Sequence, residues 1–149
     1  MKLIEEYTYD KEGYNPSLIS KGWQVAFLNY TATESLDSID KLDIHLKTDE
    51  AFILLSAQAA LIAAKITERD ITYDIVDMKQ YVIYNIPVNT WHKIAMYPGS
   101  KVCIIEKHLT HLSDFKFYHL STEQKEVLKK EVNRCIKNSK IITASLHNS

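Results

Sequence analysis

The sequence predicts an all-β domain that ends in an α-helix, and three observations lead to this prediction. Short β-prone runs follow one another with polar breaks between them, near the spacing of about 8–12 residues typical of sandwiches and barrels. Turn-forming residues occupy the breaks, as at 47–49, 87–89 and 98–100. A helix-capping signature follows the last run, at 121–124. A chain of 149 residues can bury an adequate core as one domain without disulfides or a structural metal.

The strands are expected from their β-branched and aromatic residues between turn signals. The segment at 59–65 is ambiguous, because its alanines and leucine also favour a helix. It is short and lies between two other strand candidates, so we interpret it as a strand. The predicted strands are 23–29, 41–46, 51–56, 59–65, 71–76, 81–86, 92–96 and 101–106.

The helix is expected from about 122 to 137. Ser121 and Gln124 have the spacing of a capping box, and apolar residues then recur at helical spacing on one narrow stripe. We expect this stripe to pack on the β domain or on a second copy of the chain; a helix that binds a separate partner is the alternative. Residues after 137 are expected to form a loosely held tail. The predicted organisation is therefore a β domain over 1–120, with the helix and tail of 121–149 packed on it.

Charge and composition exclude several classes of partner. The 18 basic and 19 acidic residues give a net charge of -1, which provides no general attraction for nucleic acid or an anionic membrane. The most apolar stretch, 51–65, is shorter than the roughly 20 residues of a membrane span. The opening residues lack the pattern of a signal peptide. We expect a cytoplasmic protein without nucleic-acid or membrane partners.

Chemistry-bearing residues gather at the ends of predicted strands. Asp43 and His45 share a strand face because side chains alternate, and Glu50 opens the following strand. His92 begins a later strand, directly after the turn at 87–89. Taken singly, each has a simpler interpretation: a surface or hydrogen-bonded histidine, a solvated turn carboxylate, or, for Asp43, an exposed edge balanced by nearby lysines.

These residues resemble the motifs of the cupin superfamily. The first cupin motif contains H-x-H-x3,4-E, and His45 and Glu50 match its second histidine and its glutamate, with Asp43 in place of the first histidine. The second motif contains P-x-G-x2-H, and the segment PVNTWH at 87–92 matches its proline and histidine. Four segments are similar to small bacterial cupins of unassigned function with the RmlC-like jelly roll: 22–30, 45–61, 87–94 and 117–125.

The resemblance implies a cupin-type jelly-roll barrel whose mouth holds a metal or a ligand. Two imidazoles and one carboxylate suit non-haem iron, and manganese, zinc or nickel are alternatives. The metal-ligand candidates are His45, Glu50 and His92, with Asp43 as a fourth, oxygen ligand.

Three further residues are candidates for ligand binding in the barrel mouth. Tyr81 and Phe52 lie on predicted strands, where a tyrosine hydroxyl can orient a polar ligand, with core packing as the alternative for both. Glu106 closes the last long strand.

Two functions are implied by the resemblance, and a third is structural. Larger residues stand at several motif glycines, which favours a cupin that binds a small polar metabolite without metal. The alternative is a metal-dependent isomerase, lyase or oxygenase acting on a sugar derivative or small organic acid through His45, Glu50 and His92. The third is an oligomerisation module. In each case we expect a homodimer.

Overall fold

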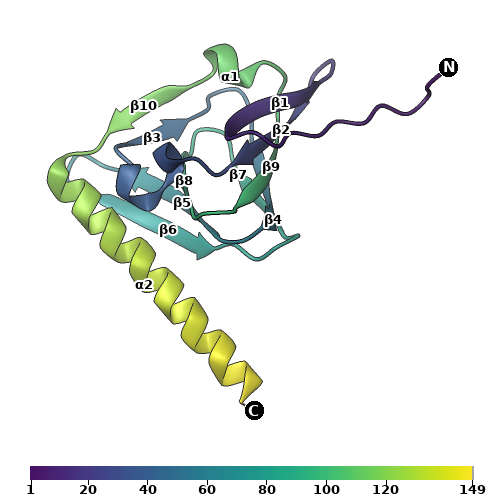
Figure 1. Ribbon diagram of the computed structural model, residues 1–149. Helices are drawn as coiled ribbons and strands as arrows, with labels where there is room; N and C mark the ends of the chain where they lie inside the picture. The colour runs from purple at the N-terminus through teal and green to yellow at the C-terminus, as the bar shows by residue number, and fades with distance from the viewer. Residues whose placement is uncertain (149) are drawn as a thin grey trace.

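Two five-stranded antiparallel sheets form the body of the protein in the computed structural model, which describes residues 1–148 (Figure 1). The first sheet contains, in spatial order, β1 (Gly13–Ile19), β2 (Gln24–Asn29), β9 (Lys101–Glu106), β4 (Glu50–Ser56) and β7 (Ile83–Ile86). The second contains β10 (Lys116–His119), β3 (Lys41–Ile44), β8 (Trp91–Met96), β5 (Ala59–Ile66) and β6 (Ile71–Asp77). Strands that are neighbours in space are mostly distant in sequence, as in a jelly roll.

All eight predicted strands are present, and two edge strands were not among them. β1 contains Pro16, which cannot donate to a ladder and is tolerated at the edge of a sheet, beside the irregular register between Asn15 and Leu18. β10 has only four residues at the edge of the second sheet. β7 begins two residues later than predicted, because Tyr81 has a positive φ of 63°.

The core has two parts, one on each face of the second sheet. Side chains from both sheets meet inside the barrel; they include Phe52, Leu61, Ile94 and Ile104. The other face of the second sheet packs against Leu36 of the short 3-10 helix Leu36–Ser38 and against the C-terminal helix; a second 3-10 helix, Ala32–Glu34, has no buried residue. β5 is buried on both faces, which explains its continuous apolar run and settles its ambiguity as a strand.

The C-terminal helix α2 (Thr122–His147) begins as predicted but is longer. Ser121 and Gln124 form the expected capping box. Leu128, Val132 and Ile136 lie four residues apart and are buried against the second sheet. The prediction of a loose tail after 137 is wrong through residue 147: neither glycine nor proline interrupts this stretch, and the helix propagates past the barrel (Figure 1). The last residue of the predicted tail lies outside the described range.

Within residues 1–148 no helix combines the length and apolarity needed for a membrane span. A single turn of helix, α1 (Thr110–Ser113), connects β9 to β10 near the open end of the barrel.

Candidate metal centre

Four strands bring the candidate residues together at one end of the barrel. His45 directly follows β3, Glu50 is the first residue of β4, His92 is the second residue of β8 and Glu106 is the last residue of β9. The strand register places Glu50 opposite Glu106, and Asp43 opposite His92. The jelly-roll order makes neighbours of residues that are 42 to 61 positions apart in sequence.

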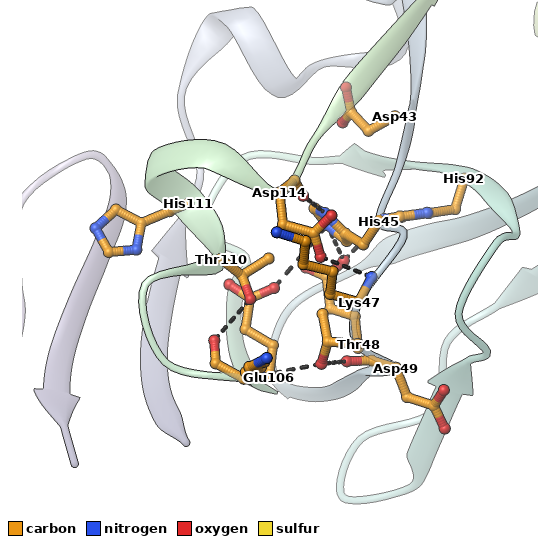
Figure 2. Close-up of polar contacts among 12 residues, drawn as sticks. Asp43, His45, Lys47, Thr48, Asp49, His92, Glu106, Thr110, His111 and Asp114 are labelled. Atoms are coloured by element: carbon orange, nitrogen blue, oxygen red, sulfur yellow. Dashed lines mark hydrogen bonds and ion pairs between the residues drawn. The ribbon is translucent and has the colours of Figure 1, made fainter. Parts of the chain in front are cut away.

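His45, Glu50 and His92 form a compact group in which their ligand atoms all lie within 4.8 Å of one another. The Oε2 atom of Glu50 is 2.8 Å from Nε2 of His45 and 2.8 Å from Nε2 of His92. Figure 2 shows the two imidazoles side by side, with ring centroids 5.1 Å apart. The sequence-predicted candidates are thus brought together, with the exception of Asp43.

The outer nitrogen of each imidazole is held by a backbone carbonyl. Nδ1 of His45 is 2.5 Å from the carbonyl oxygen of Asp114, and Nδ1 of His92 is 2.9 Å from that of Thr90. A carbonyl oxygen only accepts, so each Nδ1 carries the hydrogen. In the neutral imidazoles both Nε2 atoms therefore present lone pairs to the carboxylate of Glu50. Three electron pairs converge on one point, which requires a proton or a metal ion between them.

The pKa values of His45 and Glu50 are shifted in opposite directions. Burial favours the neutral form of His45, but the hydrogen bond and charge of Glu50 outweigh it and raise the pKa of His45 to about 9. Burial likewise favours the neutral form of Glu50, and the two histidines outweigh it, lowering the pKa of Glu50 to about 2. Without a metal, a proton on His45 therefore neutralises Glu50.

Glu106 lies beside this group with a second set of partners. Its Oε1 atom accepts from the Tyr14 hydroxyl at 2.8 Å and from Gln24 Nε2 at 3.1 Å. Its Oε2 atom is buried without a hydrogen-bond partner, 3.9 Å from Nε2 of His45. Burial and the negative charge of Glu50 raise the pKa of Glu106 above its ordinary value.

Asp43 is held elsewhere on the wall of the same pocket. Its Oδ2 atom is 3.5 Å from Nζ of Lys93, which is also 3.9 Å from Oε2 of Glu34. Asp43 stands apart from the two histidines in Figure 2 and is outside the compact group. The structure therefore places Asp43 in an ion pair with Lys93.

Asp114, which sequence reasoning did not single out, organises the turn after β3. Its carboxylate accepts from the backbone N–H groups of Leu46 and Lys47, each at 2.9 Å, and its carbonyl oxygen receives His45 Nδ1 (Figure 2). Nothing local in the sequence marks this aspartate, because it is about 70 positions from the turn that it holds.

The group opens into a cavity of about 310 Å³. Its lining combines the polar residues of the site with the apolar side chains of Leu28, Phe52, Ile94, Ile104, Phe115 and Phe117. Phe52 and Glu106, both predicted as ligand-binding, line this cavity. Tyr81 does not line it: the residue is 75% exposed, and its left-handed backbone lies before β7, which begins only at Ile83.

Comparisons with known proteins identify the fold. No protein-family model matches the chain, and no curated protein matches its sequence. Among solved structures, Streptomyces Pac13 with uridine matches with a TM-score of 0.53 and 10% identity, covering 82% of this chain and 96% of Pac13; another structure of Pac13 describes it as a nucleoside dehydratase. A protein from Shewanella oneidensis matches with a TM-score of 0.51 and 14% identity, covering 70% of this chain and 72% of that protein.

A cupin-2 domain protein from Shewanella frigidimarina matches with a TM-score of 0.47 and 16% identity, covering 67% of this chain and 85% of that protein. The two-sheet jelly roll, together with the two neighbours whose TM-scores exceed 0.5, gives the chain the cupin fold. At these identities the likeness concerns the fold alone, and the activity has to be argued from the site.

Proposed function

We propose that this protein binds a divalent metal ion through His45, Glu50 and His92, and a small polar metabolite beside it in the pocket. The convergence of the two Nε2 atoms and Glu50 Oε2 carries the proposal. The carbonyl partners of both Nδ1 atoms support it, because metal-binding histidines almost always donate their other N–H to such a group.

The donor set suits iron, manganese, zinc or nickel. When bound, such an ion would act as a Lewis acid toward an oxygen of the metabolite. The chain's own residues would shape the site: the phenylalanines of the pocket would exclude water, and the carbonyls of Thr90 and Asp114 would fix the two imidazoles. A metal ion held beside a bound metabolite would be compatible with isomerase, lyase or oxygenase chemistry.

The charges around the pocket favour a sugar derivative over a small organic acid. The carboxylates of Glu34, Asp43, Glu50 and Glu106 line it, and among residues 1–148 Lys93 is the one lysine that does. A divalent cation and Lys93 together would not outweigh the negative charge of these four carboxylates. The negative charge of an additional carboxylate on the ligand would therefore be poorly compensated. Hydroxyl groups, which donate to carboxylates, are better suited.

The first test is the metal content of the protein purified without a metal-affinity tag. We expect about one iron, manganese, zinc or nickel ion per chain, and its loss in His92→Ala. The matched control is His119→Ala, which removes an exposed histidine on β10 outside the group. Failure to bind any of these ions, even after incubation with each, would contradict the metal proposal.

A second candidate is a metal-free binding protein, and the ion pair of His45 with Glu50 favours it. A proton on His45 satisfies Glu50 without a cation. In that case the same pocket would bind its metabolite by hydrogen bonds alone. Binding of neutral sugars to the metal-free protein, unaffected by chelator, would support this candidate against the first.

The proposal includes a homodimer. The exposed apolar side chains of Ile141 and Ile142 on the projecting part of α2 support it. Light scattering on the purified chain would test it, with Ile142→Asp expected to shift the protein toward monomer.

A further inference from the structure

We infer that Glu106 is a fourth protein ligand of the metal, so that the site consists of two histidines and two glutamates and does not include Asp43. This inference rests on the proposed metal site. It departs from the sequence resemblance, which places Asp43 at the position of a cupin ligand. Three features of the structure carry it: an unsatisfied oxygen, the register of two strands, and the separations between donor atoms.

The first feature is the asymmetry of the Glu106 carboxylate. Both of its hydrogen-bond donors, the Tyr14 hydroxyl and Gln24 Nε2, contact Oε1. The amide of Gln24 is fixed in this orientation, because its own Oε1 accepts the N–H of Leu109 at 2.7 Å. Oε2 is left buried without a partner on the side of His45. An oxygen oriented in this way has the environment of a metal ligand supported by surrounding hydrogen bonds.

The second feature is the pairing of Glu50 with Glu106. They lie directly opposite each other on the adjacent strands β4 and β9, and both residues are buried. Like charges directly opposite in a sheet are destabilising, and buried charges are normally paired or coordinate a metal. Neither glutamate is within ion-pair distance of a lysine or arginine among the described residues. A divalent cation would compensate both carboxylates.

The third feature is distance. Metal–donor bonds of about 2.0–2.2 Å place donor atoms around one ion roughly 3–4 Å apart. The separations here are 2.8 Å from Glu50 to each histidine and 3.9 Å from Glu106 Oε2 to His45 Nε2. Glu106 itself lies outside the group whose ligand atoms are all within 4.8 Å of one another, so its side chain has to move toward an ion held by His45, Glu50 and His92 in order to contact it.

Asp43 shares the unsatisfied oxygen with Glu106 but lacks the other two features. Its Oδ2 atom contacts the Lys93 ammonium at 3.5 Å, so a cation already compensates its charge. Its other oxygen, Oδ1, is buried without a partner, as Oε2 of Glu106 is, but Asp43 has no ion-pair contact with either histidine of the group. Asp43 and Glu106 are consequently a matched pair of carboxylates for a direct test.

The experiment titrates Mn²⁺ into metal-free wild type, Glu106→Gln and Asp43→Asn by isothermal calorimetry, and records the absorption spectra of the Co²⁺ forms. We expect Glu106→Gln to weaken Mn²⁺ binding by at least about 10–100-fold and to change the Co²⁺ bands, because a donor is lost. Asp43→Asn should bind Mn²⁺ within about twofold of wild type with unchanged bands.

Thermal unfolding of the metal-free variants controls for folding. Glu106→Gln should melt at or above the wild-type temperature, because it removes a like charge opposite Glu50. If Glu106→Gln does not fold, Glu106→Asp keeps the charge but shortens the side chain, and it should also bind Mn²⁺ more weakly than Asp43→Asn does.

Three results would overturn the inference. If a folded Glu106→Gln variant bound Mn²⁺ with wild-type affinity, Glu106 would be excluded as a metal ligand. The proposed site of His45, Glu50 and His92 would be unaffected by that result. Weakening confined to Asp43→Asn would assign the fourth position to Asp43, and equal weakening by both would indicate a general field effect. If wild type binds no Mn²⁺, Co²⁺, Fe²⁺, Zn²⁺ or Ni²⁺, the proposed metal site fails and this inference fails with it.

Discussion

Two walls of the same pocket differ in the positive charge that compensates their carboxylates. On the wall formed by β4 and β9, Glu50 faces Glu106, and the neighbouring positive charge comes from His45, whose proton can be lost. On the wall formed by β3 and β8, Asp43 faces His92 and is paired with the ammonium group of Lys93. The first wall depends on a proton or a metal ion, whereas the second carries its own counter-ion.

The largest difference between the walls should appear with pH. In the metal-free protein the pKa of His45 is about 9, above its unfolded value of 6.5, so its contribution to stability is present below 6.5 and is lost as pH rises through 9. The pKa of Glu50 is about 2, below 4.5, so its contribution is lost as pH falls from 4.5 toward 2. We expect the melting temperature to be highest between pH 4.5 and 6.5, and to fall by about 5 °C by pH 9.5.

Calorimetric melts across this pH range, with and without Mn²⁺, would measure the effect. Saturating Mn²⁺ should reverse the trend above pH 6.5, because the metal competes with the proton on His45. A His119→Ala control, which changes an exposed histidine on β10 outside the metal group, should behave like wild type. A melting temperature that stays flat from pH 6.5 to 9.5 would contradict the ion pair.

A smaller effect is expected from the hydrogen bonds that orient Glu106. Tyr14→Phe removes the hydroxyl that donates to Oε1, and we expect Mn²⁺ affinity to fall by about tenfold while the fold is retained. Tyr97→Phe is the matched control, because its hydroxyl is buried without a partner and its ring packs on the outer face of the second sheet. Equal affinities in the two variants, measured by calorimetry, would show that this hydrogen bond does not tune the site.

The smallest effect on metal binding is expected on the other wall. Lys93→Met leaves Asp43 without its counter-ion, so we expect a loss of about 1–3 kcal/mol in the free energy of unfolding, with Mn²⁺ affinity within about twofold of wild type. Urea denaturation would measure this loss. Lys129→Met, whose ion partners are largely exposed, should cost less than about 1 kcal/mol. A large loss of Mn²⁺ affinity in Lys93→Met would remove the distinction between the walls.

Local patterns predicted the strands well, and failed where an edge or a tertiary contact decided the outcome. The run at 59–65 was identified as a strand because its neighbours and length excluded a helix. β1 was missed because Pro16 is compatible only with a strand that has a free edge. The helix was predicted to stop near 137, where its buried stripe ends, although the backbone continues as helix to His147.

The candidate site divides in the same way. His45, Glu50 and His92 were recognisable because they stand in motif spacing at strand ends, and the structure brings them within 4.8 Å. The parts played by Tyr14, Gln24 and Asp114 had no local signal, since each contacts a residue 69 to 92 positions away. Glu106 was singled out as ligand-binding, but its register opposite Glu50 could not be inferred without the sheet order.

Periodicity and turn chemistry specified an all-β domain and its capped helix, because these depend on neighbours within a few residues. The resemblance of two short motifs to those of cupins added His45, Glu50 and His92 of the candidate centre. Which group lies beside each carboxylate was decided by the order of the strands in the two sheets. That order set Glu50 against Glu106 and Asp43 beside Lys93, and it left Oε2 of Glu106 buried without a donor. Electrostatic balance in a barrel depends on which strands become neighbours, and this pairing is a property of the assembled fold.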